Sequence, residues 1–595
     1  MAVEKKSAVQ LPTRPTIAAG AGVTGRFGYA WLRAAFWCGA IALGAADAWT
    51  TRFSMNPDGV SYLDMGDAWW RGDWHMAVNA WWSPLYSWVL GFALKMLKPS
   101  AYWEYPVVHI VNFFIYVVAL GCFEFLLRAF IRQRRQVDEC SGEVAVAGLP
   151  EWAWWVLGYT LFIWTSLVLI TVSVVSPDMC LAAFFYLAWG LILRAQNETA
   201  PWRTFALFGL VLGFGYLTKA VMFPLAFVFI GVGLLSLCNL RQTIPRALLS
   251  GLTFLLIAAP FAVALSRTKG RMTFGDVGRV DYAVFVDGVD AFIPEGAALR
   301  HPVARILEHP VVYEFSGPIK GTYPIWYDPS YWHEGVKPHF NLGGQGTMLL
   351  FAAVQYGSLL FSPYMQLNIT LALFVLLLIA PRPPAGEKKA GANWRLVVPS
   401  LSAMGLYALV FTDYRFIGAF VCLLSLVGFS AVRLTAQDGN RKLIAALVIA
   451  TCLSTVGLSA RYTLLDMSRT KTAGPIYWKA AQGLLQSGVK PGDKIAVIGN
   501  QPWAETFTAR LARTQIIGQV SQRDAFWKAS PSVQSDVIDS LRSAGAKAIL
   551  TLPDLTLSNP PEPWQRLGET PYCALLLSGG SRSLRIRSAP AMVRK

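Results

Sequence analysis

Runs of about 20 apolar residues recur along most of the chain, and short segments between them carry most of the charges. A helix crosses the hydrocarbon core of a bilayer in roughly 20 residues, so each run predicts a transmembrane helix. The clearest runs are at about Trp31–Trp49, Val107–Leu127, Trp152–Thr171, Met179–Leu193, Ala247–Leu265 and Leu443–Leu458. Two more apolar runs precede RQTIPR, one ends at PRPPAGEKK, and two flank the turn TDYR. Together with the clearest runs, they predict about eleven transmembrane spans.

Lysines and arginines at the ends of these runs predict their orientation. The first run is preceded or opened by Lys5, Lys6, Arg14, Arg26 and Arg33, and the second is followed by RAFIRQRRQ. Because basic loops stay on the cytoplasmic side of a membrane, we expect a cytoplasmic N terminus and outer segments at residues 50–101 and 267–345. The expected location is multi-pass, in a bacterial inner membrane.

The composition agrees with a membrane protein. Of the 595 residues, 54% are hydrophobic and only 15% are charged. The net charge of +17 is spread over short loops and not gathered on one stripe, so we expect no nucleic-acid partner. The eight cysteines show no CxxC spacing, which argues against a disulfide framework.

The long apolar runs stop near Arg461. After that point KIAVIG and KAILTL have the pattern of short buried strands, and GPIYWKAAQGLLQSG has helical periodicity. A further helix is expected from Ser530, as N-cap, to Ala544. We therefore predict a polytopic α-helical membrane domain at residues 1–460 and a small extracytoplasmic α/β domain at residues 461–595, on the periplasmic side.

The first outer segment places acids and tryptophans together. MNPDGVSYLDMGDAWWRGDW (residues 55–74) directly follows the first apolar run. In NPDG, Asp58 has an ordinary interpretation as a helix-initiating residue, with Pro57 and Gly59 forming the turn. It also has a functional interpretation, because a loop seated in the interface by indoles holds this carboxylate where a lipid headgroup arrives.

Three motifs of this segment, D-G-V-S-Y-L, A-W-W-R-G-D and W-S-P-L-Y, resemble the first outer loop of GT-C glycosyltransferases, notably relatives of protein O-mannosyltransferases and of the aminoarabinose transferases of lipid A. VSPDM around Asp178 and YLTKA around Lys219 extend the resemblance. It implies a polyprenyl-phosphate-linked sugar donor, transfer on the outer side of the membrane, and Asp58 as catalytic base. Many relatives carry Asp-Glu at the first site, whereas Gly59 follows Asp58 here, so any role of that Glu is absent or filled elsewhere.

These residue types suit inverting glycosyl transfer. A positioned carboxylate that takes the proton of the acceptor hydroxyl contributes roughly 10²–10⁴-fold. The leaving lipid phosphate needs fixed cations, and Lys219 and Arg415 in TDYR fit that role. Both also fit a plain role, in which they snorkel from a helix end to the interface. Asp178, in S-P-D, is equally a first-turn helix residue and a carboxylate lining the catalytic cavity.

Three further side chains are candidates for substrate binding. Tyr62 follows Asp58, Tyr414 precedes Arg415, and His339 lies in the aromatic loop YDPSYWHEGVKPHFNLGGQ, which we expect to cover the cavity. His333 and Glu334 precede His339 without the i, i+4 spacing of a helical zinc site. No metal ligand is therefore assigned, although a carboxylate cluster is compatible with a divalent metal as cofactor.

The sequence thus predicts a membrane glycosyltransferase whose acceptor is a lipid, a glycan or a protein. The alternative from another class is a lipid or solute transporter or flippase without glycosyl transfer. A transporter needs polar residues along a path through its spans, whereas these spans keep their charges at the outer ends. A non-catalytic scaffold is the third interpretation, and it predicts an unchanged pathway when Asp58 is replaced by Asn.

Overall fold

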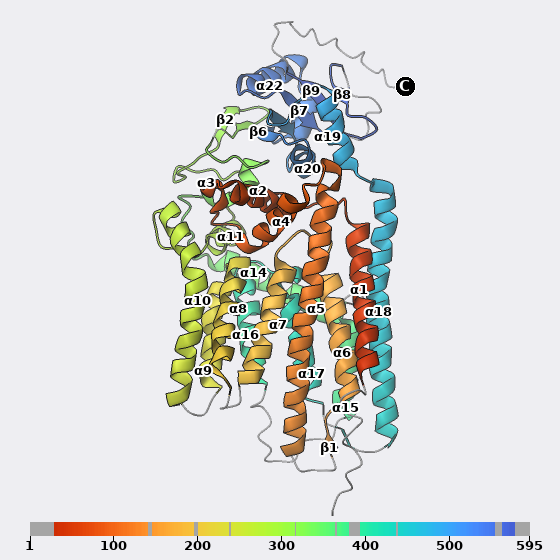
Figure 1. The fold of residues 1–595 in the computed structure, drawn as a ribbon. Coiled ribbons are helices and arrows are strands. Elements are labelled where there is room, and N and C mark those ends of the chain that lie inside the picture. The colour runs from red at the N-terminus through yellow and green to blue at the C-terminus, as the bar shows by residue number, and fades with distance from the viewer. Residues whose placement is uncertain are drawn as a thin grey trace, which may run out of the picture.

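The computed structural model describes residues 29–140, 146–195, 200–236, 240–315, 317–362, 366–379, 393–432, 434–435, 438–553 and 562–577. Upright helices form the lower part of the molecule, and a mixed sheet with its own helices forms the upper part. Short helices lie across the top of the bundle, between the two parts (Figure 1). The division into two domains at residue 460 stays a prediction, because the last helix of the bundle, α18, runs from Asp438 to Ala473.

Apolar helices make up the bundle. They are α1 (Ala30–Thr50), α5 (Ala101–Cys140), α6 (Glu151–Trp164) with its π-helical continuation η1 (Thr165–Ile170), α7 (Asp178–Ala195), α8 (Trp202–Thr218), α9 (Met222–Leu235), α10 (Leu240–Lys269), α14 (Leu342–Phe361), α15 (Leu367–Ile379), α16 (Trp394–Ala408), α17 (Tyr414–Phe429) and α18 (Asp438–Ala473). At the lower end, β1 (Val146–Ala147) pairs antiparallel with β4 (Leu434–Thr435).

Five helical stretches in the described part of the chain are long and apolar enough to cross a membrane: Ala101–Gln136, Glu151–Ile170, Asp178–Ala195, Arg241–Lys269 and Arg441–Leu465. The most apolar window of Glu151–Ile170 is 94% buried, whereas that of Arg241–Lys269 is only 22% buried. The first therefore lies inside the bundle and the second presents apolar side chains outward. This is a multi-pass membrane protein, and the count of eleven spans stays a prediction.

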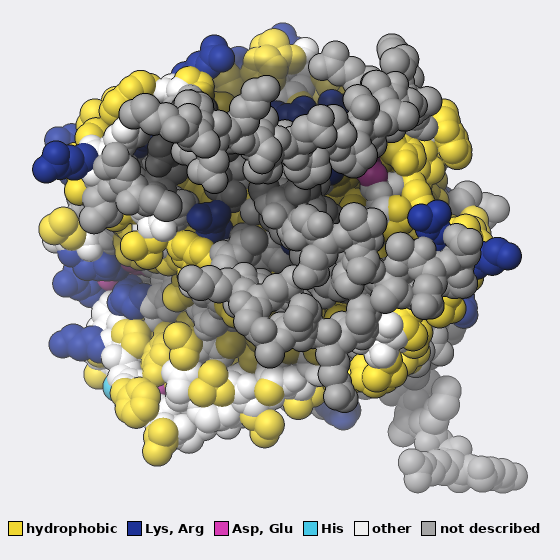
Figure 2. All heavy atoms as spheres, turned by 90° about the horizontal axis from the view of Figure 1, so that it is seen from below, with side chains coloured by type: hydrophobic (Ala, Val, Ile, Leu, Met, Phe, Trp, Pro, Cys, Tyr) yellow, Lys and Arg dark blue, Asp and Glu magenta, His cyan; other side chains and the backbone are white. Residues whose placement is uncertain are grey.

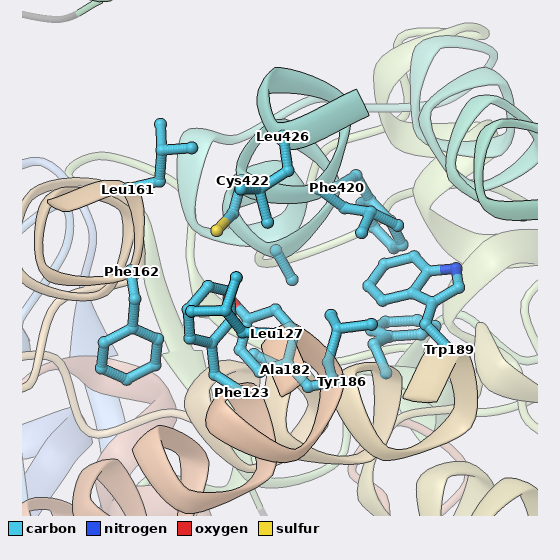
Figure 3. Close-up of a cluster of buried hydrophobic side chains, with 14 of the residues drawn as sticks. Phe123, Leu127, Leu161, Phe162, Ala182, Tyr186, Trp189, Phe420, Cys422 and Leu426 are labelled. Atoms are coloured by element: carbon cyan, nitrogen blue, oxygen red, sulfur yellow. The ribbon is translucent and has the colours of Figure 1, made fainter. Parts of the chain in front are cut away.

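The centre of the bundle is packed with aromatic side chains. Phe123 of α5, Phe162 of α6, Tyr186 and Trp189 of α7 and Phe420 of α17 are fully buried and point toward one another (Figure 3). Such close packing leaves no polar path through the middle of this cluster. Seen from below, Lys and Arg side chains are visible on several sides of the outline, and few Asp or Glu side chains can be seen (Figure 2).

Two short helices lie on top of the bundle and position the first outer segment. These are α2 (Pro57–Arg71) and α4 (Pro84–Leu97), which covers the apolar stretch after Ser83. They pack closely because glycines face each other: a Cβ on Gly66 would lie 2.6 Å from the backbone oxygen of Ser87, next to Gly91. Gly72, at φ 77°, ends α2 in the left-handed conformation that glycine favours.

The upper part is built on a seven-stranded sheet. Its order is β2-β3-β6-β5-β7-β9-β8, with β5 parallel to β6 and β7 and the other pairs antiparallel. The strands are β2 (Ala304–Leu307), β3 (Val312–Glu314), β5 (Lys494–Ile498), β6 (Gln515–Val520), β7 (Ala548–Thr551), β8 (Gln565–Arg566) and β9 (Cys573–Leu576). The helices α19 (Ile476–Gln486), α20 (Trp503–Leu511), α21 (Arg523–Lys528) and α22 (Pro531–Ser543) accompany them.

Much of this part follows the sequence pattern. β5 and β7 are the strands predicted in KIAVIG and KAILTL, and Ser530 caps α22 by accepting a hydrogen bond from the Val533 amide. The sheet differs from the prediction in taking β2 and β3 from the outer segment 267–345. These strands have only four and three residues, and β3 gains its buried neighbours by pairing with β6 about 200 positions later.

A buried charge cluster fixes the sheet to α2. Arg510 of α20 binds Asp64 and Asp67 of α2 and Glu104 of α5, each at 2.7 Å. The side chains of Arg510, Asp64 and Glu104 are only 5%, 9% and 0% exposed. Burial raises the pKa of Asp64, and the neighbouring Arg510 opposes that rise. Arg513 also pairs with Glu104, so two arginines face three carboxylates.

Replacing Arg510 with Met removes the central cation from the buried Asp64 and Glu104 and from the partly exposed Asp67. Breaking a buried ion pair in this way costs about 3–5 kcal/mol. We expect the free energy of unfolding of the upper part to fall by that order, together with faster hydrogen exchange of α2 amides. Arg542→Met is the matched control, because Arg542 forms an exposed pair with Asp539 on α22 and such pairs contribute about 0–1 kcal/mol. Equal effects of the two changes would contradict the docking role of Arg510.

Glu505 gives the upper part a pH dependence. Burial raises the pKa of this carboxyl from 4.5 to about 7, and its Oε1 accepts a hydrogen bond from the Leu552 amide. Below about pH 4.5 the group is neutral in both states; as pH rises toward 7 the unfolded chain ionises first and stability is lost. The difference between the two pKa values corresponds to about 3 kcal/mol at pH 8 and to less than about 1 kcal/mol at pH 5.

We therefore expect Glu505→Gln to stabilise the upper part at pH 8 much more than at pH 5, as measured by denaturant unfolding at both values. The glutamine side chain has the same shape, and its amide oxygen can keep the hydrogen bond from Leu552. Glu569→Gln, at a side chain that is 93% exposed, is the control and should change stability equally little at both pH values.

Candidate functional site

Four of the residues singled out in the sequence meet at the upper end of the bundle. Asp58 Oδ2 lies 3.1 Å from Arg415 Nη2, and Arg415 Nε lies 3.7 Å from Asp178 Oδ2. Lys219 Nζ donates a hydrogen bond of 2.6 Å to Asp178 Oδ1. The structure thus joins four segments that are far apart in the chain into one row of alternating charges.

Local structure explains why Asp58 and Asp178 lie together. Pro57 takes the first helical position of α2, which puts Asp58 in its first turn, where a carboxylate suits the helix dipole. The preceding Asn56 exchanges two hydrogen bonds with the backbone of Val175, at 2.8 and 3.3 Å. Val175 comes three residues before Asp178, which opens α7. The start of α2 is thereby tied to the start of α7.

Lys219 stands where α8 ends. Its backbone is extended, at φ −157° and ψ 132°, and its side chain runs between Asp178 and an aromatic ring. The ammonium lies 3.5 Å from the ring centroid of Phe416, a cation–π contact that adds to the ion pair. With 22% of its side chain exposed, Lys219 is held in the site and not extended toward solvent.

Arg415 is the centre of the site. Asp413 caps α17 by accepting a hydrogen bond of 3.1 Å from the Arg415 amide, and its carboxylate also lies 3.3 Å from Arg415 Nε. The guanidinium therefore faces Asp58, Asp178 and Asp413 at once. This arrangement fixes the orientation of Arg415, which the plain snorkelling interpretation does not require.

The two predicted catalytic acids differ in their surroundings. Asp178 is 2% exposed, and both of its oxygens are engaged: Oδ1 by Lys219, and Oδ2 by the Ser176 hydroxyl at 2.9 Å. Asp58 is 17% exposed and accepts one hydrogen bond from Arg415 and a long one, 3.3 Å, from the Trp326 indole. Asp58 is thus the more available proton acceptor, and Asp178 is better placed to hold Lys219 and Arg415.

A fourth acid reaches the site from α11 (Val277–Phe285). Burial raises the pKa of Asp281 to about 7; Lys219 lowers it and Asp58 raises it, so both lie within electrostatic reach. Near neutral pH this carboxyl is present in both protonation states, as a group that passes protons must be. The sequence analysis did not single out Asp281, because no recognisable motif surrounds it.

Trp326 covers Asp58 from a segment 268 positions later in the chain. It belongs to α12 (Pro324–Tyr327), which is followed by α13 (Pro329–Trp332). Ser61 donates to the backbone oxygen of Trp326, and the ring packs on Phe292 and on Trp503 of α20, with centroids 5.4 and 5.3 Å away. The loop that the sequence predicts as a cover begins at Tyr327, and the residue directly before it, Trp326, makes the contact with Asp58.

The three candidates for substrate binding take different positions. Tyr62 is buried, packs on Trp82 and Tyr86, and interacts electrostatically with Asp58 and Asp178, so it lines the site. Tyr414 turns away: its hydroxyl lies 2.6 Å from the Ser358 hydroxyl of α14. His339 is 71% exposed, and its ring lies 3.4 Å from Asp287. Neither contact is with a residue of the row of charges, so Tyr414 and His339 remain expectations as substrate-binding residues.

The described residues contain no group of three or more His, Cys, Asp and Glu side chains placed to hold a metal ion. At the candidate site the reason is Arg415, which lies between Asp58, Asp178 and Asp413 and occupies the place where their oxygens would converge. The donor set here suits an anion that approaches Lys219 and Arg415 better than it suits a cation.

No protein-family model matches the chain, and no curated protein sequence matches it. Among solved structures, the ArnT of Cupriavidus metallidurans in the apo state is similar with a TM-score of 0.51 at 14% identity, covering 92% of this chain and 99% of that one. The same ArnT bound to undecaprenyl phosphate gives 0.48 at 13% identity, covering 93% and 100%. The Archaeoglobus fulgidus oligosaccharyltransferase in complex with Zn and sulfate gives 0.47 at 11%, covering 87% and 67%. These proteins are GT-C glycosyltransferases, and the similarity to ArnT over nearly the whole of both chains shows that this chain has the GT-C fold.

Proposed function

We propose that the protein transfers a sugar from a polyprenyl-phosphate-linked donor to an acceptor hydroxyl on the outer face of the membrane. The observation that carries this proposal is the row Asp58–Arg415–Asp178–Lys219, which combines an available carboxylate with two fixed cations. A base for the attacking hydroxyl and cations for a leaving phosphate are the two requirements of this reaction. The shared fold of ArnT, which has been solved with undecaprenyl phosphate, is consistent with this donor class.

The position of the row suits an amphiphilic donor. Asp58, Asp178, Lys219 and Arg415 lie at helix ends on one side of the bundle, where the phosphate of a membrane lipid sits at headgroup depth. Arg194 lies in the last turn of α7, at the end opposite Asp178, so the positive-inside rule favours an outer position for the row. The polyprenyl chain then lies along the outward-facing apolar helices.

The ion pairs of the site define how the donor binds. The donor phosphate binds Lys219 and Arg415 and competes with Asp58 for the Arg415 guanidinium, which offers several N–H groups. Once released from Arg415, the Asp58 carboxylate is free to accept the proton of the acceptor hydroxyl. Asp178, held by Ser176 and Lys219, keeps the two cations in place during this exchange.

In the chemical step the acceptor oxygen attacks the anomeric carbon while its proton passes to Asp58. The bond between the anomeric carbon and the phosphate oxygen breaks, and the bonding electrons leave with the phosphate. Lys219 and Arg415 stabilise the charge that grows on that oxygen. A single displacement of this kind inverts the anomeric configuration. Aromatic rings of Trp326, Phe292 and Trp503 limit the access of water to Asp58.

The first test compares the unaltered protein with Asp58→Asn, using a panel of polyprenyl-phosphate sugars and measuring sugar transfer and donor hydrolysis. Asn keeps the shape of the side chain but cannot take the proton, so we expect turnover to fall roughly 10²–10⁴-fold with little change in donor affinity. Asp73→Asn is the control, because Asp73 caps the neighbouring α3 (Trp74–Ala77) and Asn can do the same. Full activity of Asp58→Asn would remove the base assignment, and movement of an intact donor across the membrane would favour the transporter.

The second test separates donor binding from proton transfer. Lys219→Met removes one of the two cations, so we expect weaker binding of polyprenyl phosphate itself and a loss of roughly 10²–10³-fold in kcat/KM. Lys219→Arg keeps the positive charge, so it should retain part of the polyprenyl phosphate binding and of kcat/KM. Lys95→Met, at an exposed residue of α4, should leave both quantities unchanged. If Lys219→Met binds polyprenyl phosphate as tightly as the unaltered protein, the phosphate does not rest on Lys219.

A further inference from the structure

A polar cavity lies between helices at the end of the bundle opposite the candidate site. It has a volume of about 620 Å³ and is lined by residues of α1, α5 and α7: Ala30, Arg33, Ala34, Trp37, Gly121, Glu124, Phe125, Arg128 and Arg194. Small residues open the space, since a Cβ placed on Gly121 would have only Trp37 within 4 Å, at 3.9 Å. The reaction described above makes no use of this cavity.

The charges of the cavity do not balance within the described residues. Three arginines line it, against one carboxylate. Glu124 is already saturated: Oε1 accepts from Arg33 and Arg128, and Oε2 accepts from Trp37 and, at 2.9 Å, from Tyr159. This carboxylate has no oxygen left for the third arginine.

Arg194 is that third arginine. It lies in the last turn of α7 with its guanidinium 4.2 Å from the ring centroid of Phe125, and both Arg128 and Arg132 repel it electrostatically. None of its contacts with the described residues is with an acid. Like charges held this close in a cavity beside a membrane are unfavourable, and an anion bound among them relieves the repulsion.

The depth of the cavity identifies the source of the anion. Asp178 and Arg194 lie 16 positions apart at the two ends of α7, which is roughly 24 Å along a helix. This is close to the thickness of the hydrocarbon core, about 30 Å, so Arg194 reaches the headgroup level of the opposite leaflet. Beside the cavity, Trp31, Phe114 and Val118 expose apolar surface, with 70%, 62% and 61% of each residue accessible.

We infer that this cavity binds the phosphate headgroup of an anionic lipid of the inner leaflet. Arg194 and the outer edges of Arg33 and Arg128 hold the phosphate oxygens, because guanidinium forks match phosphate geometry and basic pockets between transmembrane helices suit such headgroups. The indole of Trp37 lies where glycerol and the first chain carbons pass. The acyl chains follow the exposed apolar faces of α1 and α5. The site lies at the other end of α7 from the sugar-transfer site and does not depend on that activity.

Native mass spectrometry of the purified full-length protein tests the inference. It measures the number of bound dioleoylphosphatidylglycerol molecules and their affinity. Dioleoylphosphatidylcholine is the zwitterionic comparison. We expect Arg194→Gln to weaken phosphatidylglycerol binding roughly tenfold, the usual effect of one lost charged hydrogen bond, and Arg194→Glu to weaken it further. Because Arg194 is exposed at a helix end, neither change should prevent folding.

Arg203 supplies the matched control. It is exposed in the first turn of α8, on the same side of the membrane, and it does not line the cavity. Arg203→Gln should therefore leave binding unchanged. Equal losses in the two variants, or equal retention of phosphatidylcholine, would show only general attraction to the membrane and overturn the inference. Complete displacement of the lipid by excess inorganic phosphate would instead assign the cavity to a free anion and overturn the lipid source.

Discussion

The buried contact of Arg510 with Asp64, Asp67 and Glu104 connects the two parts of the molecule. It joins a helix of the sheet to α2 and α5 across more than 400 positions of sequence. Asp64 also accepts hydrogen bonds from the backbone amide and hydroxyl of Thr322, at 2.6 and 2.9 Å. One carboxylate thus holds α2, the sheet and the outer segment that carries Trp326. The position of Asp58 in the first turn of α2 depends on this contact.

The candidate site also places one arginine among three carboxylates, and the exposure of its side chains differs from that of the docking contact. At the docking contact, the side chains of Arg510, Asp64 and Glu104 are 5%, 9% and 0% exposed, and only Asp67 and Arg513, at 29% and 44%, reach the edge of the cluster. At the site, Asp58 and Lys219 keep 17% and 22% of their side chains exposed, and Arg415 faces three acids. Separating Asp58 from Arg415, as the proposed donor phosphate would do, costs less than separating the fully buried Glu104 from Arg510. The same residue types therefore hold α2 to the sheet in one place and, under the proposed function, form an ion pair that the donor phosphate replaces in the other.

Features that depend on local pattern could be predicted from the sequence. The ends of apolar runs predicted Asp58, Asp178, Lys219 and Arg415 on one side, and motif resemblance selected the first three from other charged residues, whereas Arg415 was chosen for its position in the turn TDYR. The cap at Ser530 and the strands at β5 and β7 followed from local propensity. Contacts that depend on distant partners left no local signal: the indole of Trp326 over Asp58, Asp281 beside Lys219, and β3 against β6. Tyr414 shows a further limit, since a neighbour of Arg415 in sequence turns its hydroxyl to another helix.

The pairing of β3 with β6 also bears on how the protein is made. Synthesis proceeds from the N terminus, so the segment containing Trp326 is made well before residues 515–520 exist to pair with β3. Until β6 is translated, the cover over Asp58 lacks the surface that holds it, and Arg510 is not yet present to fix α2. Domains generally fold once their chain is complete. Here the sheet of the upper part contains strands from two distant segments, β3 and β6. A chain still attached to the ribosome therefore carries Asp58 without the contacts that hold its cover, and these form only after residues 510–520 have been made.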